Sequence, residues 1–447
     1  FGCGRAHQAS TRPTSKALCE QEPSEQEFGE VKTPLQRTIM KAEVLYLGGN
    51  EHCVIGHLAE AADGRLFFEY DPTWTARGIE LSPVYLPNDT HGSVTTPTPQ
   101  FGPLFGLFAD SLPDWWGEQM MKRYFGDKGI PWNTVTGLQK LACAGAHAMG
   151  AIGYEPPLSG GTFREELTVE IAALVHNAHS FLHGSTEKML PGLMRSGLSP
   201  GGAQPKVLLG FNQDFSRAMA GGGHLPNGFE RWLLKFDFDP EYEHGKEEYA
   251  YSVMARAAGI NMAETHLLVG EDGTSHFLSK RFDRPGQSRR HIHTYSGLTH
   301  TLVRDGLEYG ELMDLTRVLT GSEVEVEEVF RRACFNVFAG NDDDHGKNHA
   351  FLMEPDGQWK VSPAYDLTST SNPLVSGMRA ASVNGKSVDV GRLDLKRLGE
   401  SQSVRRIDDI IEEVLAAIKD WPQWAGKAGL CKFRTEQVAD EMSGMDA

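Results

Sequence analysis

Two segments decide how this sequence is interpreted: GNDDDHGKNHAF, residues 340–351, and WKVSPAYDLTS, residues 359–369. Within the first, three aspartates, a histidine, a glycine, a lysine and an asparagine fill the seven positions from 342 to 348. Neighbouring carboxylates repel one another, so a cluster of this kind needs a compensating partner such as a metal ion or phosphoryl chemistry. The first segment therefore indicates an active site rather than an ordinary turn.

The order of the polar residues indicates phosphoryl transfer. In kinases, an aspartate accepts the proton of the acceptor hydroxyl, an asparagine a few residues later binds magnesium, and a second aspartate further along binds it too. Asp343, Asn348 and Asp366 follow this order, and Asp343 and Asn348 have the DxxxxN spacing of kinase catalytic loops. We interpret Asp343 as the catalytic base and Asn348 and Asp366 as Mg²⁺ ligands. The alternative is a solvated acidic turn that caps a helix, and for the intervening His345 a structural role is expected over metal binding.

A kinase also needs a cation on the nucleotide phosphates, usually a strand lysine paired with a helix carboxylate. Lys235, in WLLKFDF, and Glu248, at the start of the predicted helix EEYAYSVMARAAGI, suit these two roles. Glu247 competes with Glu248, and the sequence leaves that choice open. The alternative for Lys235 is an edge-strand lysine that discourages aggregation.

The third segment is glycine-rich: GLSPGGAQPKVLLG, residues 197–210. Its glycines allow a turn that can aim backbone N–H groups at phosphate oxygens, although the segment matches neither a Walker A loop nor GxGxxG. Taken alone, it is equally typical of a glycine-rich hairpin.

Hydrophobic periodicity around these segments predicts a sheet, then a mixed region, then mainly helices. Strands are expected at residues 42–49, 53–61, 64–70, 79–86 and 231–239, helices at 101–126, 134–152, 247–259, 322–340 and 405–421, and a hairpin at 265–284. Ser322 and Glu325 have the spacing of a capping box at the start of the helix that leads into the acidic segment. The expected fold class is α+β.

Composition excludes several functions. The 447 residues include 60 acidic and 43 basic side chains, and the net charge of −17 disfavours independent binding to nucleic acid. No apolar run approaches the roughly 18 residues of a membrane span, and the six cysteines form no CxxC pair, so a soluble protein of the reducing cytoplasm is expected. Residues 1–39 are polar and aperiodic, and are predicted to be a disordered or non-native extension, with a regulatory arm as the alternative.

The motifs taken together resemble the HipA family. LFADSLPDWWG, LSPGGAQPK, EEYAYSVMARAAGI, SKRFDR, NDDDHGKNHAF and SPAYDL occur in the family's order, over roughly residues 40–421. The resemblance implies a two-subdomain protein-kinase-like fold. Its expected parts are an N-terminal subdomain with a small β-barrel and helices at 40–155, a nucleotide-binding part of the kinase core at 165–300, a mainly helical C-terminal subdomain at 301–425, and a tail at 426–447.

The resemblance also implies an activity and its partners. The expected protein is an ATP- and Mg²⁺-dependent serine/threonine kinase, the toxin of a toxin–antitoxin module that phosphorylates a translation component such as an aminoacyl-tRNA synthetase. A HipB-like helix-turn-helix antitoxin is the expected partner, and DNA would be reached only through that antitoxin.

Residue roles follow from the same resemblance. Ser199 falls where the family carries a serine that the kinase phosphorylates on itself, which moves the phosphate-binding loop and switches activity off. The hinge that holds adenine is expected near residues 280–282. The nucleotide-binding residues implied in this way are Lys235, Glu248, Ser199, Gly201, Gly202, Ala203, Gln204, Lys206, Lys280, Arg281, Phe282, His345 and Lys347.

Two other classes of function remain as alternatives. A non-catalytic antitoxin- or operator-binding module would be expected to lack the base or a metal ligand, and all are present. A small-molecule phosphotransferase has no evident need for the LSPGGAQPK segment with its candidate Ser199.

Overall fold

The computed structural model of the chain describes residues 41–48, 52–158, 167–184, 191–197, 204–221, 224–239, 241–270, 272–369 and 378–443. The predicted N-terminal extension and the predicted nucleotide-binding residues Ser199, Gly201, Gly202 and Ala203 lie outside the described residues.

The N-terminal part of the described chain contains a four-stranded antiparallel sheet in the order β3-β2-β1-β4. Its strands are β1 (Lys41–Tyr46), β2 (Cys53–Glu60), β3 (Leu66–Tyr70) and β4 (Ile152–Glu155). Side chains of β1 alternate between exposed and buried, as expected where one face of a sheet covers a core. The predicted small barrel is wrong in one respect: among the described residues this sheet is open, because β3 and β4 at its two ends do not pair with each other, and beyond its pairing with β2, β3 forms only a single bridge, from Phe68 to Val94.

The strand predicted at residues 79–86 does not form. Pro83 lacks the N–H that a strand ladder requires, and the chain turns so that Leu86 N–H donates to the Ser82 carbonyl at 3.1 Å. Leu81 and Leu86 are both fully buried by this turn. Apolar spacing alone did not distinguish the two geometries.

Short helices lie between β3 and β4 in the sequence. They are α1 (Pro72–Thr75), α2 (Gly106–Ala109), α3 (Trp115–Gly126) and α4 (Gly137–Ala144). Trp116 of α3 is buried, and its indole N–H donates to the Lys206 carbonyl at 2.7 Å. Trp115, directly before it, is 49% exposed. The tryptophan pair therefore has one packing residue and one surface residue.

The central part is a six-stranded antiparallel sheet in the order β5-β7-β6-β8-β10-β9. Its strands are β5 (Leu167–Val169), β6 (Lys206–Asn212), β7 (Ala218–Ala220), β8 (Phe229–Lys235), β9 (Thr265–Val269) and β10 (Ser275–Lys280). The helices α5 (Ile171–Leu182), α6 (Pro191–Ser196) and α7 (His244–Ala257) accompany it, and α7 packs on β9 and β10. Lys235 lies on β8, an interior strand, which excludes the edge-strand interpretation of this lysine.

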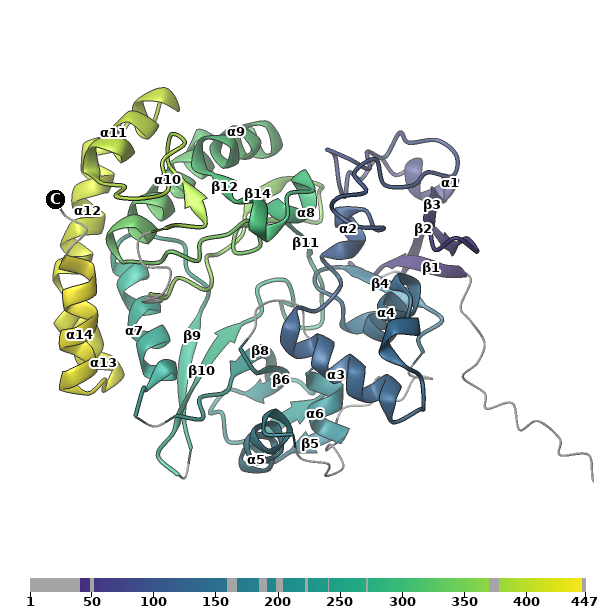
Figure 1. Cartoon of the computed structure of the whole chain (residues 1–447), viewed down its shortest axis with the longest axis horizontal. Helices are drawn as coiled ribbons and strands as arrows, with labels where there is room; N and C mark the ends of the chain where they lie inside the picture. Colours follow the sequence, from purple (N-terminus) through teal and green to yellow (C-terminus); the bar gives the residue numbers. More distant parts are fainter. Residues whose placement is uncertain are drawn as a thin grey trace, which may run out of the picture. The chain divides into compact units, whose positions relative to one another are not determined.

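Helices dominate the C-terminal part, as expected from the sequence (Figure 1). They are α8 (Tyr295–Thr299), α9 (Tyr309–Thr320), α10 (Glu323–Phe338), α11 (Arg392–Ser401), α12 (Ile407–Lys419), α13 (Trp421–Ala428) and α14 (Lys432–Ser443). Ser322 caps α10 by accepting the Glu325 N–H at 3.4 Å. The segment predicted as a tail contains α14, whose Val438 and Met442 are buried.

Small strand pairings fix the segments that carry the acidic cluster. One sheet contains β11 (His291–Thr294), β13 (Ala350–Met353) and β14 (Trp359–Val361), and a parallel pair joins β12 (Leu307–Glu308) to β15 (Ala381–Ser382). Residues 340–349 thus form the connection between the buried helix α10 and the buried strand β13. None of the helices in the described ranges has the length and apolar character needed to cross a membrane.

Candidate active site

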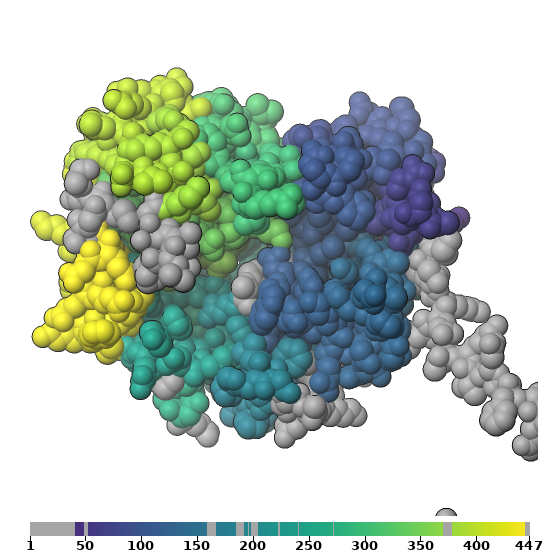
Figure 2. All heavy atoms as spheres, viewed as in Figure 1, coloured from purple at the N-terminus to yellow at the C-terminus, as the bar shows by residue number. Residues whose placement is uncertain are grey.

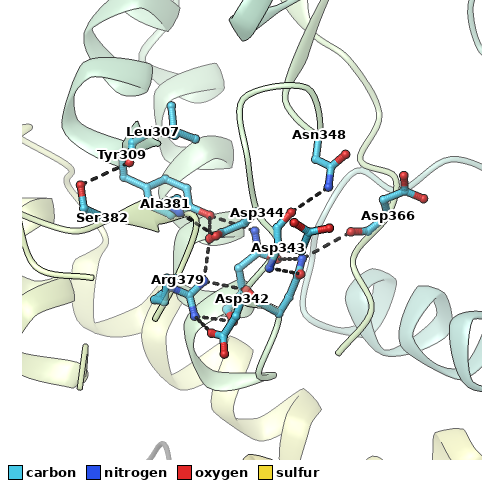
Figure 3. Close-up of polar contacts among 12 residues, drawn as sticks. Leu307, Tyr309, Asp342, Asp343, Asp344, Asn348, Asp366, Arg379, Ala381 and Ser382 are labelled. Atoms are coloured by element: carbon cyan, nitrogen blue, oxygen red, sulfur yellow. Dashed lines mark hydrogen bonds and ion pairs between the residues drawn. The ribbon is translucent and has the colours of Figure 1, made fainter. Parts of the chain in front are cut away.

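The acidic connection between α10 and β13 is anchored by its third aspartate. Asp344 is fully buried, and its carboxylate accepts hydrogen bonds from Tyr309 Oη at 2.8 Å, Arg379 Nη2 at 2.6 Å and the Ala381 N–H at 3.0 Å (Figure 3). A buried charge is tolerated when it is paired and hydrogen-bonded in this way. Asp344 is therefore a structural anchor.

Arg379 extends the anchoring to the neighbouring residues. Its Nη1 donates to Asp342 Oδ1 at 3.0 Å, and its Nη2 donates to the Asn341 carbonyl at 2.8 Å. Asp342 and Asp344 are both ion-paired with this single guanidinium, which is only 4% exposed. Asp343, between them, is left with a side chain that is 61% exposed and lines a cavity.

Asp343 has an environment suited to a base. Partial desolvation raises the pKa of Asp343 above its ordinary value, and the negative charges of Asp366 and Asp344 raise it further, against the opposing effect of His345. A higher pKa makes a carboxylate a better proton acceptor at neutral pH.

The predicted metal ligands converge on the same cavity. Asn348 Nδ2 donates to the Asp343 carbonyl at 2.9 Å, and the amide oxygen is the atom of this side chain that could bind a cation (Figure 3). Asp366 has a left-handed backbone, with φ of +53°, and its carboxylate pairs with Lys235. Burial alone would raise the pKa of Asp366, but the ammonium groups of Lys235 and Lys206 lower it to about 2.

Lys235 settles the choice between the two glutamates of α7. Its ammonium group pairs with both Glu248 and Asp366, whereas Glu247 forms an ion pair with Arg434. Consecutive helical residues point about 100° apart, so only one of the two glutamates can face β8. The two carboxylates outweigh the effect of burial and raise the pKa of Lys235.

A second lysine lies beside Lys235. Lys206 is the residue directly opposite Lys235 in the β6–β8 ladder, and it is only 2% exposed. Burial lowers the pKa of Lys206 to about 8, against the raising effect of Asp366 and Glu248. Both ammonium groups line the same cavities as Asp366 and Asn348.

The predicted hinge residues line the mostly apolar end of this space. Lys280, Arg281 and Phe282 are all found there, together with the apolar side chains of Leu112, Met149, Leu233, Met262, Phe277 and Ile292. Lys280 pairs with Glu230 at 2.6 Å and Glu264 at 2.9 Å, and Arg281 pairs with Asp283 at 2.6 Å. Figure 2 shows a hollow bounded by blue, teal and green parts of the chain.

The remaining predicted residues, Gln204, His345 and Lys347, line the polar end next to Asp343. His345 Nε2 lies 3.9 Å from Asp343 Oδ1, and Lys347 forms an ion pair with Asp114. Sequence reasoning missed Asp114, Trp115 and Arg379 as site residues. The first two stand in the LFADSLPDWWG motif, to which no role in the site was assigned.

The donor set fits Mg²⁺. The described residues contain no group of three or more histidine, cysteine or carboxylate side chains that could together hold a metal ion. Asn348 and Asp366 offer one amide and one carboxylate oxygen, and Mg²⁺ in nucleotide sites commonly takes only one or two protein ligands beside phosphate oxygens. The residues present are sufficient for this mode of binding.

Comparison with protein families gives two matches. The HipA N-terminal domain matches residues 50–155, and the HipA-like C-terminal domain matches residues 198–421.

Similar proteins carry kinase names. The chain is 28% identical over 166 residues to the putative kinase Y4dM of Sinorhizobium fredii, covering 34% of this chain and 40% of that protein. It is 28% identical over 203 residues to the serine/threonine-protein kinase toxin HipA of Shewanella oneidensis, covering 38% of this chain and 43% of that protein. The chain thus aligns with less than half the length of either relative.

A solved structure is similar over nearly the whole chain. It is the HipA chain of a Shewanella oneidensis complex of HipA, HipB and operator DNA, with a TM-score of 0.66 and 20% identity, covering 90% of this chain and 97% of that one. This likeness confirms the predicted α+β kinase-like fold class.

Proposed function

Because the chain belongs to the HipA family, we propose that it is an ATP- and Mg²⁺-dependent serine/threonine protein kinase with Asp343 as its base. The observation that carries this proposal is the convergence of Asp343, Asn348 and Asp366 on one cavity with the Lys235–Glu248 ion pair. Asp343 and Asn348 share one segment, whereas Lys235, Glu248 and Asp366 come from three others, yet all five residues line one cavity. Together they supply the groups that phosphoryl transfer needs.

The nucleotide would lie along the cavity with its base at the apolar end and its phosphates at the polar end. Phe277, Phe282 and Met262 offer apolar contacts for adenine, while Lys206 and Lys235 offer two adjacent cations for the phosphates. The side-chain charges of Lys280 and Arg281 are already paired, so the hinge would recognise adenine through its backbone.

The acceptor hydroxyl would lose its proton to Asp343 as the γ-phosphoryl group transfers. Asn348 and Asp366 would hold Mg²⁺, which when bound offsets the charge on the phosphate oxygens. Asp344 and Arg379 fix the backbone on either side of Asp343, so the base is positioned before the acceptor arrives. Such preorganisation is a large part of what a kinase contributes.

A second opening supports a polypeptide as the acceptor. A groove with a volume of about 950 Å³ also reaches Asp343 without including either nucleotide lysine, and its walls include Val303, Glu308, Glu311 and Met378. This volume is at the upper end of the range for small-molecule pockets. The groove and the polar cavity share Asp343 and Val303.

The finer parts of the proposal rest on the relatives. We infer that the chain is the toxin of a toxin–antitoxin module, that it phosphorylates a translation component such as an aminoacyl-tRNA synthetase, and that Ser199 is its autophosphorylation site. A HipB-like antitoxin fits the assembly named for the solved relative. The net charge of −17 supports DNA contact through that antitoxin alone, and the free thiols of Cys143, Cys334 and Cys431 suit a cytoplasmic protein.

Incubation with γ-labelled ATP and Mg²⁺, followed by peptide mapping, tests the proposal. We expect label on Ser199 in the native chain and none in Asp343→Asn, because the amide cannot accept the hydroxyl proton. Asp356→Asn, which alters an exposed turn after β13, serves as the matched control and should label like the native chain. Equal labelling of Asp343→Asn and the native chain would show that Asp343 is not the base.

A further inference from the structure

Glu247 and Glu248 connect Lys235 to the C-terminal helix. Glu248 faces inward and pairs with Lys235, while Glu247, 2% exposed, faces α14. Arg434 of α14 meets Glu247 with a two-pronged contact, Nε to Oε2 at 2.6 Å and Nη2 to Oε1 at 2.9 Å. Bidentate pairs of this kind are strong and fix orientation as well as distance.

The same helix also touches the segment that carries Asp366. Glu441 of α14 accepts a hydrogen bond from Ser369 Oγ at 3.2 Å, and Ser369 lies three residues after Asp366. Arg434 Nη1 also lies 3.5 Å from Glu441 Oε1. A continuous polar chain therefore runs from Glu247 through Arg434 and Glu441 to Ser369.

Further contacts hold α14 against the start of α7. The Cys431 N–H donates to Glu243 Oε2 at 2.7 Å, and Glu243 is the residue that precedes α7. The Trp421 indole N–H donates to the Thr435 carbonyl at 2.9 Å, and the ring of Trp421 packs against Tyr251 of α7 with centroids 5.2 Å apart. Figure 1 shows α13 and α14, in yellow, next to α7.

We propose that α14 is a positioning element for the nucleotide site, acting through Arg434 and Glu441. Lys235 is held by two carboxylates, Glu248 and Asp366, and α14 fastens both of the segments that present them. The matched HipA-like C-terminal domain ends at residue 421, so α14 lies outside it. This inference rests on the proposed kinase function and adds a determinant of ATP binding that is remote from the phosphates.

The physical reason lies in the freedom of α7. Without Arg434, the buried Glu247 carboxylate loses its two-pronged partner, and α7 can reduce that cost by rotating Glu247 toward water. Any such rotation turns Glu248 away from Lys235, because the two glutamates share one rigid helix. Lys235 would then be drawn to Asp366 alone, and both groups would be displaced from the positions needed for phosphates and Mg²⁺.

The test is the initial rate of label incorporation into Ser199 as a function of ATP concentration in the full chain. We expect Arg434→Ala to raise the KM for ATP about tenfold, within the range observed for mutations that weaken a connecting network. Arg434→Lys keeps the positive charge but loses the planar guanidinium that contacts both oxygens of Glu247. Its KM for ATP should therefore lie between those of the native chain and Arg434→Ala. Lys432→Ala, on the same helix with a side chain that is 88% exposed, should match the native chain.

The KM for ATP separates positioning from mere destabilisation. A variant that is only partly unfolded loses kcat while its KM for ATP stays native, whereas a misplaced Lys235–Glu248 pair raises the KM. The double variant Glu247→Gln with Arg434→Ala should be no worse than the single Arg434→Ala, since both act through one contact. If Arg434→Ala proves insoluble, Arg434→Lys and Glu441→Gln provide the same readout, each with a smaller expected rise.

A native KM for ATP in every folded Arg434 and Glu441 variant would overturn the inference. If the native chain itself transfers no label, the proposed function fails instead. Binding of a Mg²⁺-bound non-hydrolysable ATP analogue, measured by calorimetry, then still tests α14, because weaker binding by Arg434→Lys than by the native chain supports the positioning role and equal binding refutes it.

Discussion

At the scale of single residues, the two adjacent lysines of the site, Lys206 and Lys235, differ in pKa. Carboxylates raise the pKa of Lys235, whereas burial lowers the pKa of Lys206 to about 8. Lys206 is therefore protonated below about pH 8 and becomes neutral as the pH rises above it. Lys235 stays charged throughout that range.

This difference predicts a pH-dependent affinity for nucleotide. As the pH rises from 8 to 9, we expect the Kd for a Mg²⁺-bound ATP analogue to weaken by up to about tenfold, because one pKa unit corresponds to about a factor of ten. Lys206→Met should bind weakly at every pH and lack this alkaline loss. Calorimetric titration at pH 7, 8 and 9 measures both, and an unchanged alkaline loss in Lys206→Met would assign the titration to another group.

Residues close together in sequence were predictable, and partners far apart were not. Asp343 and Asn348 could be proposed from the sequence because their spacing is itself the signal, and their roles stay a prediction. The partner of Asp344 could not, because Arg379 lies 35 positions away and nothing near it in sequence indicates a role. Glu247 and Glu248 remained indistinguishable because the sequence does not say which side of α7 faces β8.

At the scale of elements, the connection between α10 and β13 depends on one guanidinium. Arg379 pairs with Asp342 and Asp344, and the latter is completely buried. Removing one partner of a buried ion pair leaves an uncompensated charge, whose cost generally exceeds the net worth of the pair.

We therefore expect Arg379→Ala to lower the free energy of unfolding by about 3–5 kcal/mol. It should also abolish labelling of Ser199, since Asp343 lies between the two aspartates that lose their anchor. Equilibrium denaturation in urea measures the first effect. Arg406→Ala, whose ion pairs with Asp409 and Glu413 lie on the surface, is the control and should leave the unfolding midpoint nearly unchanged. A small effect of Arg379→Ala would mean that Tyr309 and the Ala381 N–H suffice to hold Asp344.

Element types were predicted unevenly: the helix expected at 134–152 is only α4, because the chain after Ala144 continues into a short 3-10 turn and then into β4. The helix that ends in the acidic segment and the hairpin β9–β10 were predicted from pattern and are present. The strand predicted at residues 79–86 is instead a turn that buries two leucines, because Pro83 cannot join a ladder. The sequence also could not show whether the first sheet closes into a barrel, because its fourth strand, β4, comes from a distant part of the sequence.

At the scale of the whole molecule, the first sheet and the C-terminal helices belong to one hydrophobic core. Buried residues of β1 and β2, such as Val44 and Leu58, belong to the same cluster as Phe335 of α10 and Val438 of α14. The central sheet has a separate core with α3 and α5, which includes Trp116 and Leu234. The strands that carry Lys206 and Lys235 thus pack on the separate core of the central sheet. Asp343, the proposed catalytic base, follows α10, which packs in the core shared with the first sheet.

This arrangement predicts that a mutation that destabilises the first sheet also destabilises α10, which leads into the segment that holds Asp343. Leu58→Ala should cost about 2–5 kcal/mol, the range for such truncations in cores, and the loss should appear in α10 as well as in β2 because one core spans both. Hydrogen exchange followed by mass spectrometry measures it: amides of α10 should exchange faster in Leu58→Ala than in the native chain, and those of α5 should change less. Faster exchange confined to β1–β3 would mean that the sheet opens independently, and the shared core would then not couple the first sheet to the segment that holds Asp343.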